Sequence, residues 1–139
     1  MNLKEIIGGT SPFAEMLGVR VDRFGDGAGQ CSLEIREEML NMHRAVHGGV
    51  IYSLADIGMG VALYSLLDQG EKCSTVEIKI NYFLPARGKR LVCASRVLRK
   101  GRSIAVLEAE VKDRQRLIAK GMGTFAVLVA DGFSGKGKD

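Results

Sequence analysis

Residues 48–67 constrain the fold most, because their apolar side chains do not follow one face of a helix. They fall on nearly every side of it, at Val50, Ile51, Leu54, Ala55, Ile57, Val61, Ala62, Leu63, Leu66 and Leu67. A helix that is apolar on all sides is normally buried. The pattern therefore predicts one long central helix over residues 48–67, ended by Gly70.

Most of the remaining chain alternates apolar and polar residues, which is typical of strands with one buried face. Strands are expected at residues 19–24, 30–36, 73–84, 91–99, 104–112 and 117–128. The turn Gly25-Asp26-Gly27 joins the first two as an antiparallel hairpin. Within residues 73–84, the alternation predicts Val76 and Ile78 on one face and Thr75 on the other.

These elements predict an α+β fold in which a curved antiparallel β-sheet wraps around one long central α-helix, since only that helix is apolar on all sides. Sequential strands are expected to be joined by tight turns, and two short helices, at residues 3–7 and 12–17, are expected to precede them. With 139 residues, 46% of them hydrophobic, the chain can form one core. We therefore expect a single domain over residues 1–130 and a disordered Gly/Lys-rich tail over residues 131–139.

Composition argues against several classes of protein. The 20 basic and 16 acidic residues give a mild net charge of +4, and without tryptophan or an aromatic-rich strand motif we expect no nucleic-acid partner. No stretch approaches the roughly 20 apolar residues that cross a bilayer, and no export signal opens the chain, so a cytoplasmic protein without membrane contact is expected. The three cysteines are far apart without CxxC spacing, so no zinc or other metal site is expected.

Asp56 is the most unusual residue of the predicted helix. A buried carboxylate costs several kcal/mol unless it is hydrogen-bonded, paired or protonated. One interpretation is structural, with Asp56 capping a loop or pairing with an arginine such as Arg87. The other is catalytic, and the smaller or more polar residues Tyr52, Ser53 and Gly60 on the same face favour a cavity there.

The tripeptide His47-Gly48-Gly49 stands directly before this helix. Two glycines at a helix start allow a ligand to approach the backbone closely, and the free N–H groups attract developing negative charge. These are the properties of an oxyanion hole. The alternative is an ordinary glycine turn with a structural histidine.

The combination is more specific than its parts. The spacing Asn41-x5-His47-Gly48-Gly49-x4-Leu54-x-Asp56-x3-Gly60 places an amide, a histidine, backbone donors and a carboxylate in one segment. This segment resembles the signature of hotdog-fold acyl-CoA thioesterases of the phenylacetate-degradation type. The similarity extends over residues 13–128 and includes the segments 81–86 and 99–102.

The resemblance implies a hotdog fold and roles for individual residues. Gly48 would donate its backbone N–H to the thioester carbonyl, while Asn41 and His47 shape the same pocket. Asp56, contributed in this family by the partner subunit, would act as nucleophile or as general base on water. Thr75 would orient that water or support the carboxylate, and Ser74 would replace it if the strand register slips by one.

The resemblance also implies how coenzyme A is bound. Family members often carry glycine where this chain has Arg44, so the loop is either shaped differently or offers a cation to a coenzyme phosphate. The residues expected around the bound substrate are Gly49, Arg44, Ser74, Arg87, Lys100 and Arg102. A solvated hairpin tip is the alternative for the last two.

The expected function is therefore hydrolysis of acyl-CoA, with an aryl or medium-chain acyl group, to free acid and CoA. No cofactor is implied, since coenzyme A is part of the substrate. A homo-oligomer is expected, a dimer of dimers with the active site at the dimer interface. Two alternatives stay open: a non-catalytic acyl-CoA sensor, and a hotdog dehydratase or hydratase, which relies on a catalytic histidine.

Overall fold

A computed structural model describes residues 3–8 and 11–129 of the chain. Its helices and strands are α1 (Leu3–Ile7), α2 (Pro12–Leu17), β1 (Arg20–Gly25), β2 (Ala28–Glu34), a 3-10 turn η1 (Glu37–Met39), α3 (Gly48–Tyr64), β3 (Glu71–Tyr82), β4 (Arg90–Lys100), β5 (Ile104–Asp113) and β6 (Arg116–Val129). The tail predicted at 131–139 lies outside the described residues. No helix in the described ranges is long and apolar enough to cross a membrane.

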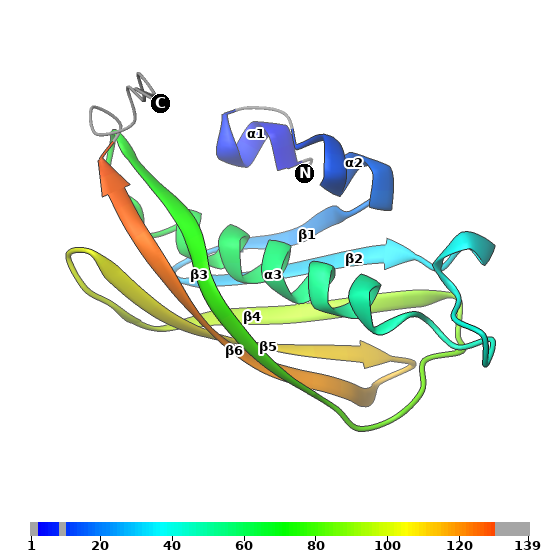
Figure 1. The fold of residues 1–139 in the computed structure, drawn as a ribbon. Helices are drawn as coiled ribbons and strands as arrows, with labels where there is room; N and C mark the ends of the chain where they lie inside the picture. The colour runs from blue at the N-terminus through cyan, green and yellow to red at the C-terminus, as the bar shows by residue number, and fades with distance from the viewer. Residues whose placement is uncertain (1–2, 9–10, 130–139) are drawn as a thin grey trace, which may run out of the picture.

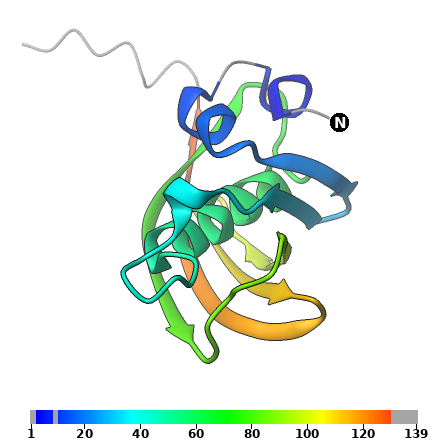
Figure 2. The ribbon, with the colours of Figure 1, turned by 90° about the vertical axis from the view of Figure 1, so that its right-hand side faces the viewer.

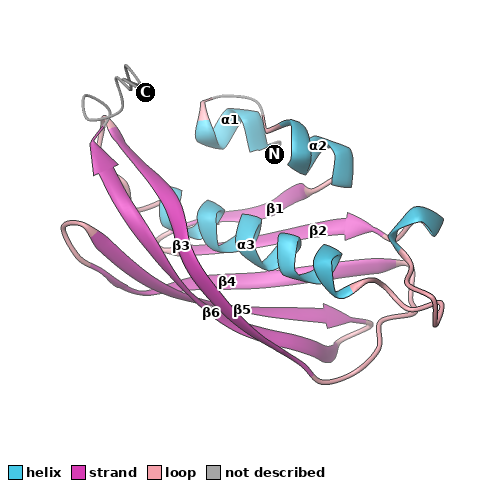
Figure 3. Ribbon diagram, in the orientation of Figure 1, coloured by secondary structure: helices cyan, strands magenta, loops and turns pink. Residues whose placement is uncertain are grey.

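The six strands form one antiparallel sheet that curves around α3 (Figures 1 and 3). Figure 2, viewed from the end at which α3 begins, shows the sheet beside and beneath the helix, with α1 and α2 above it. Leu54, Ala55 and Met59 of α3 are fully buried in the core. The predicted hotdog arrangement of a curved sheet around one central helix is thus confirmed.

The strand order β1-β2-β4-β5-β6-β3 differs from a sheet of sequential neighbours. β3 pairs with β6 and forms one edge of the sheet. The chain reaches β3 from β2 through α3, which has 17 residues and is about 25 Å long. The helix also ends at Tyr64, three residues before the predicted limit. The edge of β3 that faces away from β6 has no partner strand among the described residues.

A β-bulge in β3 overturns the predicted alternation of its side chains. The register with β6 shifts between Thr75 and Glu77, which makes Val76 the extra residue and leaves it 59% exposed. The bulge reverses the faces on its N-terminal side. Thr75 and Ile78 therefore both face α3, whereas clean alternation would have placed them on opposite faces.

A buried carboxylate fixes the β3–β4 connection near the start of α3. Asp113, at the end of β5, accepts hydrogen bonds from the backbone N–H groups of Arg87 (3.1 Å) and Gly88 (2.9 Å) and is 2% exposed. The connection is joined in turn to the chain before α3, because the N–H of Val46 donates to the carbonyl of Ala86 at 2.9 Å. Asp113 thus positions one wall of the region in which α3 begins.

Replacing Asp113 with alanine should lower the free energy of unfolding by about 3 kcal/mol, because two backbone donors lose a charged acceptor. Urea denaturation followed by circular dichroism measures the change. Asp113→Asn keeps an acceptor oxygen and should recover part of the loss. An alanine variant as stable as the wild type would show that the carboxylate does not fix this connection.

Candidate active site

The start of α3 has two glycine N–H groups, and the structure separates them. His47 is the N-cap residue, and its Nδ1 accepts a hydrogen bond from the N–H of Gly49 at 2.9 Å. The Nδ1 atom of His47 therefore serves as the cap of the helix. The N–H of Gly49 is therefore occupied by a cap, and it is not a free donor for a substrate.

The N–H of Gly48 has no hydrogen-bond acceptor within the described part of the chain. Gly48 lines a groove of about 360 Å³, together with Asn41, Ile51, Tyr82, Phe83 and Pro85. A free N–H at the positive end of a helix that borders a groove is suited to stabilise an oxyanion. Of the two glycines, only Gly48 has a free N–H that can stabilise an oxyanion.

Tyr82, which the sequence analysis did not single out, holds Gly48 in place. Its hydroxyl donates to the carbonyl of Gly48 at 2.8 Å, and its ring lies 3.3 Å from where a side chain on Gly48 would begin. Burial, and then the nearby Tyr52, raises the pKa of Tyr82, so the hydroxyl keeps its proton at neutral pH. The only sequence signal was its position in the segment 81–86.

Asn41 organises the loop before the helix. Its Oδ1 accepts the backbone N–H groups of His43 (2.9 Å) and Ala45 (3.2 Å). Arg44, within this loop, has a φ of 63°. Glycine adopts this left-handed conformation most easily. The loop of this chain therefore accommodates arginine in a backbone conformation that glycine favours.

Asp56 and Thr75 form the polar contact in the middle of α3. The Thr75 hydroxyl donates to Oδ1 of Asp56 at 2.6 Å. Asp56 is half-buried, and no cation of the described residues pairs with it. The structural interpretation of Asp56 as an ion-pair partner of Arg87 is therefore not supported. Ser74 lies on the opposite face of the strand from Thr75.

Cys73 is the other ionisable group near Asp56. Burial, and to a smaller extent the Asp56 carboxylate, raises the pKa of the Cys73 thiol to about 11. The thiol therefore stays protonated at neutral pH and is a poor nucleophile. The anionic group available at this site is the carboxylate of Asp56.

If the expected thioester hydrolysis takes place here, replacing Thr75 with valine should lower its kcat about tenfold with little change in KM, because a hydrogen bond to a charged group is lost. Thr124→Val is a matched control, since Thr124 donates to a carboxylate oxygen of Glu77 at 2.7 Å on the outer face of the same strand pair. Steady-state kinetics of the two variants measure kcat and KM. Equal effects of the two substitutions would remove any special role of Thr75.

Gly48 and Asp56 of one chain lie far apart on α3. They are eight residues apart on α3, which separates them by about 12 Å along the helix axis. A carbonyl that accepts the N–H of Gly48 is therefore out of reach of the Asp56 carboxylate of the same chain.

The basic residues predicted around coenzyme A do not form one cluster. Arg44 pairs with Glu37, and Lys100 pairs with Glu71 at 3.2 Å. The predicted cations Arg87 and Arg102 have exposed side chains without a partner among the described residues. They lie at opposite ends of the sheet, since the β3–β4 connection is near the start of α3 and the β4–β5 hairpin near its end (Figure 1).

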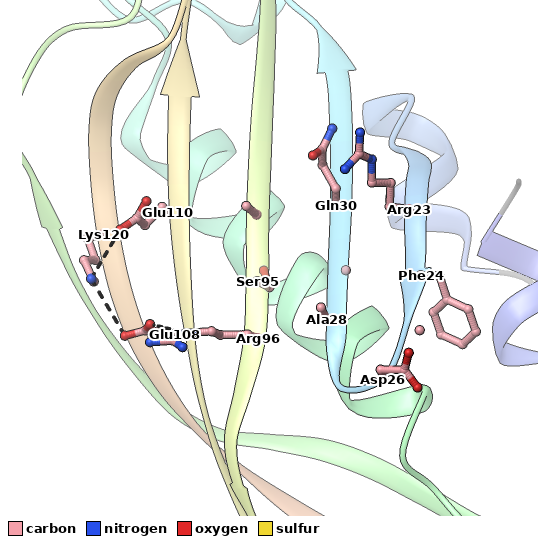
Figure 4. A pocket seen from close by; sticks show the side chains of 13 residues that line it. Arg23, Phe24, Asp26, Ala28, Gln30, Ser95, Arg96, Glu108, Glu110 and Lys120 are labelled. Atoms are coloured by element: carbon pink, nitrogen blue, oxygen red, sulfur yellow. Dashed lines mark hydrogen bonds and ion pairs between the residues drawn. The ribbon is translucent and has the colours of Figure 1, made fainter.

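A further hollow of about 700 Å³ lies on the outer face of the sheet and is lined by residues of β1, β2, β4, β5 and β6 (Figure 4). None of the predicted catalytic residues lines it. Four of its charged groups pair with one another, with Glu108 2.6 Å from Arg96 and Glu110 3.3 Å from Lys120. The described residues contain no cluster of three or more His, Cys, Asp or Glu side chains that would hold a metal ion.

Comparison with known proteins identifies the family of this chain. Residues 43–120 match the model of the thioesterase superfamily, and the chain belongs to this family of thioester hydrolases. It is 31% identical to a putative esterase of Saccharolobus solfataricus, over 91% of this chain and 90% of that protein. It is 29% identical to the medium/long-chain acyl-CoA thioesterase YigI of Escherichia coli, over 84% of this chain and 85% of that protein.

Solved structures show the same fold. The conserved protein PA5202 from Pseudomonas aeruginosa superposes with a TM-score of 0.84 at 36% identity, covering 91% of this chain and 99% of that one. A mutant of the phenylacetic acid degradation protein PaaI from Thermus thermophilus superposes with a TM-score of 0.78 at 27% identity, covering 85% and 100%. The resemblance to phenylacetate-degradation thioesterases stated from the sequence is thus confirmed.

Proposed function

We propose that this chain hydrolyses acyl-CoA to free acid and CoA at a site shared between two subunits. The N–H of Gly48 from one subunit binds the thioester carbonyl oxygen, and the Asp56 carboxylate of the other subunit acts on the carbonyl carbon. The observation that carries the proposal is a pair of groups on α3: the N–H of Gly48, which has no acceptor among the described residues, and the Asp56 carboxylate, which accepts a hydrogen bond from Thr75 but pairs with no cation among them. Neither of these two polar groups contributes to the packing of the hydrophobic core.

The separation of these two groups supports a shared site. Two copies of α3 that run antiparallel side by side bring each Gly48 close to the Asp56 of the other, which closes the gap of about 12 Å. The unpaired edge of β3 provides the contact, because a second β3 can continue the sheet there. A dimer, and from the family resemblance a dimer of dimers, is the proposed assembly.

The chemistry needs few groups. The thioester carbonyl is electrophilic, its thiolate leaves readily, and the Gly48 N–H stabilises the negative charge that develops on the carbonyl oxygen. Asp56 either attacks the carbonyl carbon itself or removes a proton from an attacking water. In both schemes Thr75 holds the carboxylate in one orientation, while Asn41 and His47 hold the loop and the helix start that present Gly48.

The names of the relatives and the positions of the basic residues support an acyl-CoA as the substrate. A medium- or long-chain acyl-CoA fits the named activity of YigI, and an aryl acyl group remains a candidate from the resemblance to PaaI. Near the start of α3, Arg44 and Arg87 are the cations proposed to contact CoA phosphates. Arg102 and Lys100 lie at the other end of the sheet, far from Gly48 of their own subunit. They are therefore proposed to contact only the nucleotide of a CoA bound at another subunit's Gly48.

A hotdog dehydratase is the weaker candidate, because its chemistry needs a free histidine and the Nδ1 of His47 is already engaged by Gly49. A non-catalytic sensor would bind acyl-CoA without turnover. Thiol release from acetyl-, octanoyl-, palmitoyl- and phenylacetyl-CoA separates a hydrolase from a sensor, and water loss from a 3-hydroxyacyl-CoA tests the dehydratase. Steady turnover of at least one substrate is expected. Tight binding without thiol release, or loss of water from a 3-hydroxyacyl-CoA, would overturn the proposal.

A further inference from the structure

A second groove flanks the start of α3 on the side opposite to Tyr82. It has a volume of about 470 Å³ and lies between α2 and the first half of α3. Its apolar lining comes from Phe13, Met16, Leu17, Met39 and Val50. His47 and Gly49 stand at its end, so the groove reaches the residues on both sides of Gly48.

The exposed face of α2 carries two large apolar side chains. Ala14 and Leu17 are 1% and 6% exposed and attach this short helix to the core. Phe13 and Met16, three residues apart on another face, are 52% and 61% exposed. Adjacent large apolar side chains that the core does not use often mark a ligand-binding surface.

The helix α2, which forms one wall of the groove, is fixed by hydrogen bonds at its C-terminal end. Arg36 donates to the carbonyls of Leu17 (3.1 Å) and Met16 (2.8 Å), the last carbonyls of α2, and pairs with Glu38 at 2.8 Å. Gly18, with a φ of 74°, ends the helix in the left-handed conformation. The groove is therefore formed before any ligand binds, which lowers the cost of binding.

Charge distinguishes this groove from the one lined by Tyr82. Its one arginine, Arg36, is already engaged by Glu38 and by the end of α2. The Tyr82 groove instead lies beside the connection that carries Arg87, an exposed cation without a side-chain partner in the described ranges, and beside the loop of Arg44, which is paired with Glu37. The groove beside α2 therefore suits an uncharged acyl chain, and the Tyr82 groove suits the phosphate-bearing part of coenzyme A.

We infer that the groove between α2 and α3 binds the acyl chain of the substrate, and that Phe13 and Met16 set the preferred chain length. The inference rests on the proposed function, since it assumes a thioester at Gly48. The acyl arm runs from the Gly48 N–H past Val50 and beneath α2. Longer chains bury more of their surface against Phe13 and Met16 than short chains do.

The test compares kcat/KM for acetyl-, octanoyl- and palmitoyl-CoA in Phe13→Ala, Met16→Ala and Met42→Ala. Met42 is the matched control, because it is 88% exposed and lines neither groove. Each α2 substitution should lower kcat/KM for the two longer substrates about tenfold and leave acetyl-CoA within about twofold. Thermal unfolding checks that α2 stays attached.

The outcomes separate this inference from the proposed function. If the wild type hydrolyses the panel but the α2 variants keep its chain-length profile, or lose all substrates equally, the groove assignment is wrong and the proposed function stands. If the wild type hydrolyses no acyl-CoA, the proposed function itself fails. A change in profile confined to Phe13→Ala and Met16→Ala, absent from Met42→Ala, supports the inference.

Discussion

Replacing Asp56 with asparagine is expected to lower kcat for acyl-CoA hydrolysis by about 10³, because general-base or nucleophilic groups typically contribute 10²–10⁴. Asparagine has nearly the same shape and still accepts the hydrogen bond of Thr75, so the fold and substrate binding should change little. Thiol-release kinetics at saturating substrate measure the loss. KM and the unfolding temperature should stay near the wild-type values.

Asp26→Asn is the matched control for this experiment. Asp26 lies in the β1–β2 turn with a φ of 52°, a conformation that asparagine also tolerates, so activity should be unchanged. If the Asp56 variant kept more than a tenth of wild-type turnover, the carboxylate would have no chemical role. Thr75 would then be only a structural neighbour of it.

Replacing Gly48 with proline is expected to lower kcat about 10²- to 10³-fold, because it removes one oxyanion-hole donor. Proline suits the first position of a helix, where its missing N–H has no helical partner. His47 has φ −59° and ψ 136°, the extended conformation that a residue before proline prefers. The substitution therefore removes the donor with little cost to α3.

Gly48→Ala separates the loss of the donor from the gain of a side chain. Alanine keeps the N–H, and its methyl group lies 3.3 Å from the Tyr82 ring, a contact that a small shift relieves. The alanine variant should retain most of the activity that the proline variant loses. Equal kcat values in the two variants would show that crowding at Tyr82, rather than the missing N–H, causes the effect.

The central helix and the catalytic segment were predictable because their signals are local. An all-round apolar helix and the spacing from Asn41 to Gly60 can both be read from a short stretch of sequence. The position of Thr75 was predicted on the wrong face, because the bulge at Val76 depends on pairing with β6, about 50 residues later. Local alternation cannot reveal such an insertion.

The sequence also could not show that the N–H groups of Gly48 and Gly49 have different roles. Gly48 and Gly49 are chemically identical, and only the cap by His47 shows that one N–H is occupied. Similarly, Tyr82 reaches Gly48 across 34 residues of sequence, and no short-range pattern links them. The pairing of Arg44 with Glu37 and of Lys100 with Glu71 likewise depends on tertiary contacts that charge patterns do not specify.

The most direct test is to mix the two inactive subunits, Asp56→Asn and Gly48→Pro, by co-expression. A mixed dimer has one site built from two intact residues and one built from two altered residues. Half of randomly formed dimers are mixed, so activity should return to about a quarter of the wild-type value. A mixture no more active than either parent would contradict a site shared between two copies of α3.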